Sequence, residues 1–356
     1  MFFILVINPG STSSKVAIYE DKEEKFKESL NHNIPPNTSV EEEVEIRKKD
    51  IQNFINKNGF TLKNINGIAC RGGILPPMEG GTYSVNIEMV EFLLYKSKVT
   101  HPSNLAAPVG FSISEGKIPV FITDPVSTDE FWELSRLSGL SQIPRISLLH
   151  ALNMKAVARK TNEMLGKKKG NYVIAHLGGG FSIGLMINNK IVDVNNAIDE
   201  GPFSPNRTGS LPVFDVAKKA FTGEFSKKEM KKRYTKTGGL LAYTGEDNVE
   251  ILLKKYDNNP EIKLAIDAMI YQIAKEISGM CAVGSGNIDG IILTGGLVKS
   301  NFIVNKIKEY VSNYGNIYLY PGEMEMEALA LGTFRILNGD EKAEAFDLEG
   351  ILSEQT

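Results

Sequence analysis

Two short segments rich in glycine and hydroxyl-bearing residues have the composition of phosphate-binding turns. The first, residues 7–15, reads INPGSTSSK, and the second, residues 174–182, reads IAHLGGGFS. Small residues leave the backbone N–H groups of such a turn open to an anion, and Lys15 adds a positive charge nearby. The first segment is not a Walker loop, because it lacks the second glycine and the hydroxyl residue after the lysine. Taken alone, it is equally compatible with a phosphate site and with a plain hairpin.

Both segments belong to a pattern that occurs twice along the chain. A shift of 168 positions places Asn8 on His176 and aligns a strand, a glycine-rich turn, a second strand and a polar hairpin. A second pair follows in the same order, INGIACRGG at 65–73 and IDGIILTGG at 288–296. A strand that ends in two glycines is common in α/β proteins, but two different signals repeated in order predict a duplicated α/β domain. Paired turns that face each other across a cleft would grip a polyphosphate from both sides.

The elements that must position these turns follow from hydrophobic periodicity and from turn residues. We expect strands over residues 2–7 and 14–20, with a third strand after a hairpin turn. Apolar residues at helical spacing, between a capping residue and a glycine, predict helices. The expected helices are residues 39–59, residues 147–166, a core helix that starts at Pro260, and a last helix over 325–337.

The length of 356 residues exceeds what one hydrophobic core normally serves, so we expect two domains. The second repeat carries additional residues at about 195–255, and an irregular insertion of this length is typical of a binding element. We place a first domain at 1–147, completed by the C-terminal segment 325–356, and a second domain at 148–324.

Composition and charge exclude several classes of protein. The formal net charge of −3 and the isoelectric point near 6.0 give no electrostatic footprint for nucleic acid or for an anionic membrane. The basic cluster at 227–233 is interrupted by Glu229, which predicts a solvated helix face. Cys70 and Cys281 lack zinc or redox spacing, so we expect buried, inert thiols in a reducing compartment. The apolar start, residues 1–8, is too short for a membrane span and lacks the features of a signal peptide, which predicts a cytoplasmic protein.

Six segments, spread in order over nearly the whole chain, resemble the acetate and butyrate kinases. They are VINPGSTSSK, HPSN, HLGGG, NRTGSL, LTGG and PGEMEMEALALG. Acetate kinases typically have a histidine before two glycines where this chain has Arg71, and the segments CRGG, TDPVST, GPFSPNRTGSLP and YPGEMEMEALALG are similar to butyrate kinases instead. The resemblance implies an α/β, duplicated ribonuclease-H-like fold of the actin-like ATPase type. Such a fold has two domains, mixed sheets and a nucleotide cleft between the domains.

The resemblance also implies a reaction, the reversible in-line transfer of the ATP γ-phosphoryl group to butyrate or a branched analogue, which gives an acyl phosphate and ADP. A carboxylate is already ionised near neutral pH, so this reaction needs charge neutralisation and positioning rather than a strong general base. A planar guanidinium suits the task, because it binds oxygens in pairs. Arg207 matches the arginine of the family, and Arg71 is the second candidate. The alternative for either is a surface ion pair.

Three further side chains match catalytic positions of these kinases. The resemblance makes His176 a donor to the phosphoryl group in the transition state, without a covalent phosphohistidine, although a lone histidine on an apolar strand is often a core residue. Asp124 matches the aspartate near the metal and the acceptor, with a plain Asp-Pro turn as the alternative. His101 is equally compatible with a site wall and with a helix start. His32 and His150 receive no assignment.

The resemblance assigns the remaining candidates to the nucleotide and to Mg²⁺. The nucleotide-binding candidates are Asn8, Gly10, Ser11, Thr12, Ser13, Lys15, Gly178, Gly179, Gly180, Asp247, Gly295 and Gly296. Asn8 and either Glu325 or Glu327 would help to place Mg²⁺, directly or through water. We favour Glu327, because it directly precedes a helix of small residues. A solvated acidic helix start is the alternative.

Other functions stay open at this level. They are an acetate or propionate kinase or a sugar kinase on the same fold, and a non-metabolic actin-like or chaperone-like ATPase module. A sugar kinase would need a carboxylate base at the acceptor and fewer arginines. A module would need polymer contacts or an appended peptide-binding domain. The expected partners are the short-chain carboxylate and the acyl phosphate, with no nucleic acid and no membrane, and the likeness implies a homodimer or a larger homo-oligomer.

Overall fold

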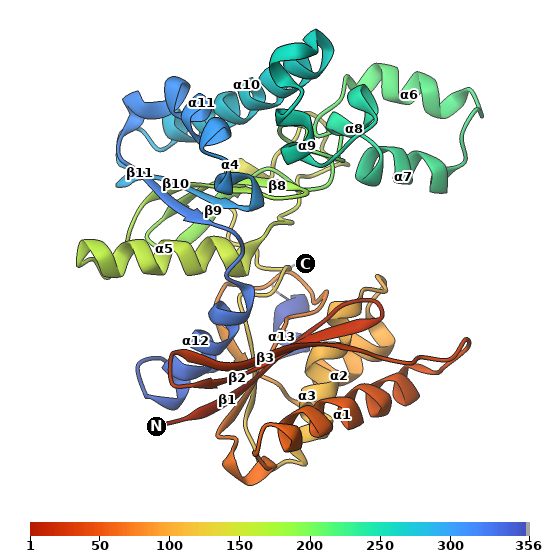
Figure 1. The fold of residues 1–356 in the computed structure, drawn as a ribbon, viewed down its shortest axis with the longest axis vertical. Coiled ribbons are helices and arrows are strands. Elements are labelled where there is room, and N and C mark those ends of the chain that lie inside the picture. The colour runs from red at the N-terminus through yellow and green to blue at the C-terminus, as the bar shows by residue number, and fades with distance from the viewer. Residues whose placement is uncertain (354–356) are drawn as a thin grey trace. The chain divides into compact units, whose positions relative to one another are not determined.

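A computed structural model describes residues 1–353 of the chain, which divide into two compact units (Figure 1). Unit 1 comprises Met1–Asp129 together with the chain from Met324 onward, and unit 2 comprises Glu130–Glu323. The expected boundary after residue 147 lies inside unit 2, and the segment that follows Asp129 is hydrogen-bonded to the second sheet: the N–H of Trp132 donates to the carbonyl of Val192 at 3.0 Å.

Unit 1 is built on a seven-stranded sheet with the order β12-β5-β6-β4-β1-β2-β3. Its strands are β1 (Phe3–Pro9), β2 (Ser13–Glu20), β3 (Glu23–Asn31), β4 (Gly67–Cys70), β5 (Thr82–Ser84), β6 (Val120–Thr123) and β12 (Glu344–Ala345). Its helices are α1 (Val40–Lys57), α2 (Ile87–Glu91), α3 (Ala106–Ser114), α12 (Glu325–Leu337) and α13 (Leu348–Ser353). β1, β2 and β3 form an antiparallel meander, whereas β1, β4 and β6 run parallel. The carboxyl ends of the three parallel strands therefore meet at one edge.

Unit 2 repeats this plan with a five-stranded sheet of order β11-β10-β7-β8-β9. Its strands are β7 (Tyr172–Leu177), β8 (Phe181–Ile187), β9 (Lys190–Val194), β10 (Gly290–Gly295) and β11 (Ile317–Pro321). Its helices are α4 (Glu133–Arg136), α5 (Ala151–Leu165), α6 (Val213–Phe221), α7 (Lys227–Lys236), α8 (Gly239–Thr244), α9 (Val249–Leu253), α10 (Pro260–Val283) and α11 (Asn301–Val311). Helix α5 covers one face of the sheet, and α10 and α11 cover the other (Figure 1).

The two sheets share both the meander and the parallel strands that follow it. The order β3-β2-β1-β4-β6 in unit 1 corresponds to β9-β8-β7-β10-β11 in unit 2, with the same strand directions. The predicted duplication is therefore confirmed. The insertion of unit 2, expected to be irregular, contains α6, α7, α8 and α9.

The helix predictions hold, with one correction. Helix α1 begins after Ser39, whose side chain forms a capping box with Glu42, and α10 begins at Pro260 as expected. Helix α5 begins at Ala151 rather than near Ser147, because the backbone at His150 (φ −85°, ψ 56°) is not helical. Among the described residues, no helix is both long and apolar enough to cross a membrane.

Candidate active site

Three candidate side chains of unit 1 lie at the carboxyl edge of its sheet. Asn8 is near the end of β1, Arg71 directly follows β4, and Asp124 directly follows β6. The backbone N–H of Arg71 donates to the carbonyl of Ile7 at 3.0 Å, which extends the pairing of β1 with β4 to this edge. Parallel strand order thus gathers residues that are more than a hundred positions apart in the sequence.

Glu325, at the start of α12, joins two of these residues. Its carboxylate accepts a hydrogen bond from Nδ2 of Asn8 at 3.0 Å and forms an ion pair with Arg71. Glu327, which we favoured from the sequence, is near enough to Tyr19 for its charge to act on the phenol. Burial, together with the charges of Glu24 and Glu327, raises the pKa of Tyr19. Among the described residues no group of three or more histidine, cysteine or acidic side chains could hold a metal ion.

Asp124 occupies a strained position at this edge. Its φ of 40° lies in the left-handed region, which is costly for a residue with a side chain, and it is only 1% exposed. The backbone is held there because the N–H of Asp124 donates to the carbonyl of Gly81 at 2.8 Å. Strain of this kind is typical of functional positions.

His101 belongs to the same group of side chains. It caps the 3-10 turn Pro102–Leu105, and its Nδ1 lies 2.6 Å from Oγ of Ser103. Burial and then the positive charge of Arg71 lower the pKa of His101. The imidazole therefore starts the 3-10 turn and also lies within electrostatic reach of Arg71, which fits both alternatives.

The turn between β1 and β2 is held from behind by an arginine that sequence reasoning missed. Arg47, on α1 and 1% exposed, donates hydrogen bonds to the carbonyls of Gly10, Ser11 and Ser13, each at 3.0 Å. A signal was present, because position 47 lies at helical spacing from the apolar Val44, Ile51 and Phe54, the side that α1 buries.

In unit 2, His176 lies at the end of β7 and is held by a second residue that the sequence did not identify. Nδ2 of Asn153, on α5, lies 2.8 Å from Nδ1 of His176 and 3.0 Å from Oγ1 of Thr294. Because the Asn153 amide nitrogen can only donate, Nδ1 of His176 is an acceptor, and a neutral imidazole carries its proton on Nε2.

His150, which the sequence left without an assignment, stacks on His176. The ring centroids are 4.0 Å apart and the planes differ by 10°. Nδ1 of His150 lies 2.9 Å from Oγ of Ser182. Two parallel imidazole rings, those of His176 and His150, therefore lie together near the carboxyl end of β7.

Arg207 packs directly against the second glycine-rich turn. A side chain at position 180 would overlap the Arg207 guanidinium, so only glycine permits this approach. Nη1 of Arg207 donates to the carbonyl of Ala197 at 2.7 Å, and Oγ of Ser204 bridges the Arg207 N–H to the carbonyl of Gly179. Burial lowers the pKa of Arg207, which reflects the cost of keeping a cation from water without an anion beside it.

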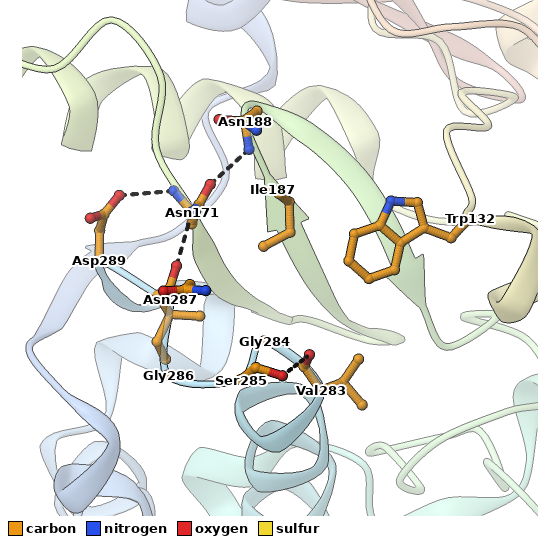
Figure 2. A pocket seen from close by; sticks show the side chains of 11 residues that line it. Trp132, Asn171, Ile187, Asn188, Val283, Gly284, Ser285, Gly286, Asn287 and Asp289 are labelled. Atoms are coloured by element: carbon orange, nitrogen blue, oxygen red, sulfur yellow. Dashed lines mark hydrogen bonds between the residues drawn. The ribbon is translucent and has the colours of Figure 1, made fainter.

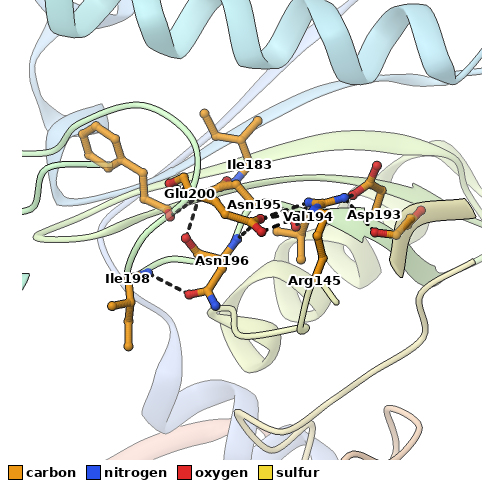
Figure 3. Close-up of polar contacts among 10 residues, drawn as sticks. Arg145, Ile183, Asp193, Val194, Asn195, Asn196, Ile198 and Glu200 are labelled. Atoms are coloured by element: carbon orange, nitrogen blue, oxygen red, sulfur yellow. Dashed lines mark hydrogen bonds and ion pairs between the residues drawn. The ribbon is translucent and has the colours of Figure 1, made fainter. Parts of the chain in front are cut away.

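The segment that carries Ala197 is itself held by a partly buried network (Figure 3). Arg145 donates to Asp193 at 2.9 Å, to the carbonyl of Val194 at 2.9 Å and to Glu200 at 3.1 Å. Glu200 in turn accepts from the N–H of Asn196 at 2.9 Å. The chain that leaves β9 is thus rigid where it meets Arg207.

The other nucleotide candidates of unit 2 lie at or near the same edge. Gly295 ends β10 with φ 99°, and a side chain there would overlap the Leu177 backbone. Gly296 follows it in a 3-10 turn and faces open space. Asp247 is exposed and accepts from Nδ2 of Asn206 at 3.4 Å, which places it beside the segment of Arg207.

A separate cavity of about 730 Å³ lies at the opposite edge, where β7 and β10 begin (Figure 2). Trp132 and Ile187 line it, together with the loop that precedes β10. Asn171 joins its loops through hydrogen bonds to the backbones of Asn188 and Asn287. It contains none of the candidate residues.

Comparison with known proteins supplies the family. Residues 145–318 match the acetokinase family. Over 350 residues the chain is 46% identical to a Thermotoga maritima protein named "Probable butyrate kinase 1", and the match covers 96% of this chain and 98% of the relative. The chain belongs to the acetokinase family. The resemblance inferred from the sequence segments is thereby confirmed.

Solved structures show that this acetokinase has the expected fold. A Porphyromonas gingivalis acetate kinase superposes with a TM-score of 0.78 at 17% identity, covering 95% of this chain and 100% of the other. A propionate kinase from Francisella tularensis superposes with a TM-score of 0.73 at 19% identity, covering 93% and 99%. The predicted duplicated α/β fold of the actin-like ATPase type is confirmed.

Proposed function

We propose that this acetokinase transfers the γ-phosphoryl group of ATP to butyrate or a branched analogue, reversibly, to form an acyl phosphate and ADP. The observation that carries the proposal is the approach of Arg207 to the Gly178–Gly180 turn, which brings a cation to a turn suited to phosphate. The 46% identity, over 96% of this chain, to a protein named "Probable butyrate kinase 1" supports the choice of acceptor.

In the proposed step, a carboxylate oxygen attacks the γ-phosphorus while the bond to the β–γ bridging oxygen breaks and ADP leaves. Arg71 and Arg207 neutralise the charge of the acceptor and of the transferred group. His176 donates its Nε2 proton as a hydrogen bond to a phosphoryl oxygen, and Asn153 keeps that proton on Nε2. Asp124 helps to orient the acceptor and the metal. No general base is required, because the acceptor is already ionised.

The nucleotide phosphates bind to the amides and hydroxyls of the Gly10–Ser13 turn, to Lys15 and to the Gly178–Gly180 turn. The strand end at Gly295 and Gly296, together with Asp247, receives the adenosine. Glycine at 295 is required by its backbone conformation as well as by close contact with Leu177.

Mg²⁺ fits the donor set at the edge of unit 1. Asn8 would supply an amide oxygen and Glu325 a carboxylate, and Mg²⁺ typically uses one or two carboxylates together with substrate phosphates and water. Glu325 is preferred over Glu327, because it contacts Asn8. When bound, the ion would neutralise charge that develops on the phosphates.

A hydroxamate assay tests this proposal. We expect acyl phosphate to form from ATP, Mg²⁺ and butyrate or isobutyrate, with lower catalytic efficiency on acetate and propionate, and we expect a chelator to abolish it. One methylene in an apolar pocket is worth about 1–3 kcal/mol, so the preference among acids should be graded. Phosphorylation of a sugar, or ATP hydrolysis without acyl transfer, would contradict the proposal and favour a sugar kinase or an ATPase module.

We further propose that the protein is a cytoplasmic homo-oligomer. Cys70 and Cys281 are buried free thiols, and burial raises the pKa of both, which suits a reducing compartment. Large apolar side chains are exposed on residues 134–146 and on α6. Both segments line one cavity of about 490 Å³, together with polar and charged residues such as Arg145 and Glu200, and a second copy would cover the exposed apolar side chains.

A further inference from the structure

All three nitrogen atoms of the Arg47 guanidinium donate hydrogen bonds to residues of unit 1. Its donors reach the carbonyls of Gly10, Ser11 and Ser13, and Nη1 also donates to Oγ of Ser14 at 3.0 Å. Glu43, one helical turn earlier, accepts from Nε at 2.9 Å and from Nη2 at 2.7 Å. This carboxylate balances the buried positive charge.

The carbonyl of Thr12, the fourth in the turn, also accepts a hydrogen bond. The N–H of His32 donates to the carbonyl of Thr12 at 2.9 Å. In a planar trans peptide the C=O of one residue and the N–H of the next point in opposite directions. Turning the carbonyls of Gly10 and Ser11 inward to Arg47 therefore turns the amides of Ser11 and Thr12 outward. Within residues 1–353 those two exposed amides donate to no other group.

A second buried contact supports the arrangement. The His32 ring is inaccessible to solvent, with Nε2 2.8 Å from Oγ of Ser14 and Nδ1 2.7 Å from Oδ2 of Asp50. Since Ser14 accepts from Arg47, its hydroxyl proton is available for Nε2 of a neutral His32, whose Nδ1–H then donates to Asp50. Every polar group of this network has a partner, which makes the network rigid.

We propose that Arg47 is a positioning residue for nucleotide binding: it holds the Gly10–Ser13 turn with the amides of Ser11 and Thr12 directed outward, ready for phosphate oxygens. The inference rests on the proposed function, in which this turn binds the nucleotide. Arg47 itself touches neither substrate, because all its donors are used by the turn, Ser14 and Glu43.

The variant Arg47→Lys tests the inference, because a single ammonium group cannot reach the same set of carbonyls. We expect the Kd for ADP, measured by calorimetry, and the KM for ATP to rise at least tenfold. The KM for butyrate should change less than threefold. The milder Glu43→Gln keeps the arginine but removes the balancing charge, and we expect it to raise the Kd for ADP about threefold. If Arg47→Lys does not fold, the Kd of Glu43→Gln for ADP tests the inference in its place.

A matched control is Lys155→Met, which also removes a buried cation that bonds to a carboxylate, Glu130 at 2.7 Å, and to a backbone carbonyl, but in unit 2. It should lower the melting temperature without changing the Kd for ADP. Unchanged ADP affinity in Arg47→Lys and Glu43→Gln, or equal losses for ADP and butyrate, would overturn the inference. Wild-type protein that binds ADP but makes no acyl phosphate would contradict the proposed function alone, because the ADP affinities would still decide the role of Arg47.

Discussion

Arg207 and Arg47 show how burial and partners separate two roles of one residue type. Arg47 is 1% exposed and has every donor occupied by carbonyls, a hydroxyl or a carboxylate. Within the described part of the chain, the side chain of Arg207 makes one hydrogen bond, to the carbonyl of Ala197, and lies against a glycine turn. A guanidinium that still has N–H groups without protein acceptors can bind a ligand anion. A guanidinium whose N–H groups all have protein acceptors can only hold the backbone in place.

The residue-scale prediction concerns Arg207. Replacement by Ala should lower kcat with butyrate at least 100-fold, a loss of about 2.7 kcal/mol in transition-state stabilisation, because no other guanidinium takes its place beside Gly180. Steady-state kinetics with ATP and butyrate, together with a thermal melt, measure this. Arg233→Ala on α7, where no residue is buried, is the control and should retain activity. Near-normal turnover in Arg207→Ala would remove this side chain from the site.

At the scale of elements, strand ends and glycine turns decide where the chemistry lies. β7 delivers His176, the turn after it makes room for Arg207, and α5 supplies Asn153 to the His176 ring. Asn153 also donates to Thr294 on β10, which runs parallel to β7, so the helix is bonded to the ends of both strands.

The element-scale prediction compares two glycines of unit 2. Gly180→Ala should displace Arg207 and lower kcat at least tenfold, because the added methyl group overlaps the guanidinium. Gly279→Ala adds the same group in the exposed interior of α10, where no atom lies within 4 Å. It should leave kcat unchanged and stabilise the fold by about 0.5–1 kcal/mol. Equal activity of the two variants in the acyl phosphate assay would show that the contact with Arg207 does not matter.

At the scale of the whole molecule, the two units share one strand order. The prediction at this scale concerns the exposed apolar side chains of residues 134–146 and of α6 in unit 2. A chain of 39.2 kDa should elute as a dimer or larger assembly when light scattering measures its mass. Val213, on α6, is 81% exposed. The substitution Val213→Asp should shift the measured mass toward that of the monomer, because a charge would be buried in the contact between copies. Tyr271→Asp, exposed on α10, should not. A monomeric wild-type protein would refute the assembly.

The sequence by itself determined the duplicated α/β plan, the strand ends that carry glycine turns, and most candidate residues at those ends. These are local signals, since hydrophobic period, capping and turn residues act over a few positions. Only the tertiary structure showed that Glu325 contacts Asn8, that His150 stacks on His176, and that Arg47 faces the first turn. Those pairings join residues far apart in the chain, and they depend on helix rotation and side-chain direction, which local periodicity does not resolve.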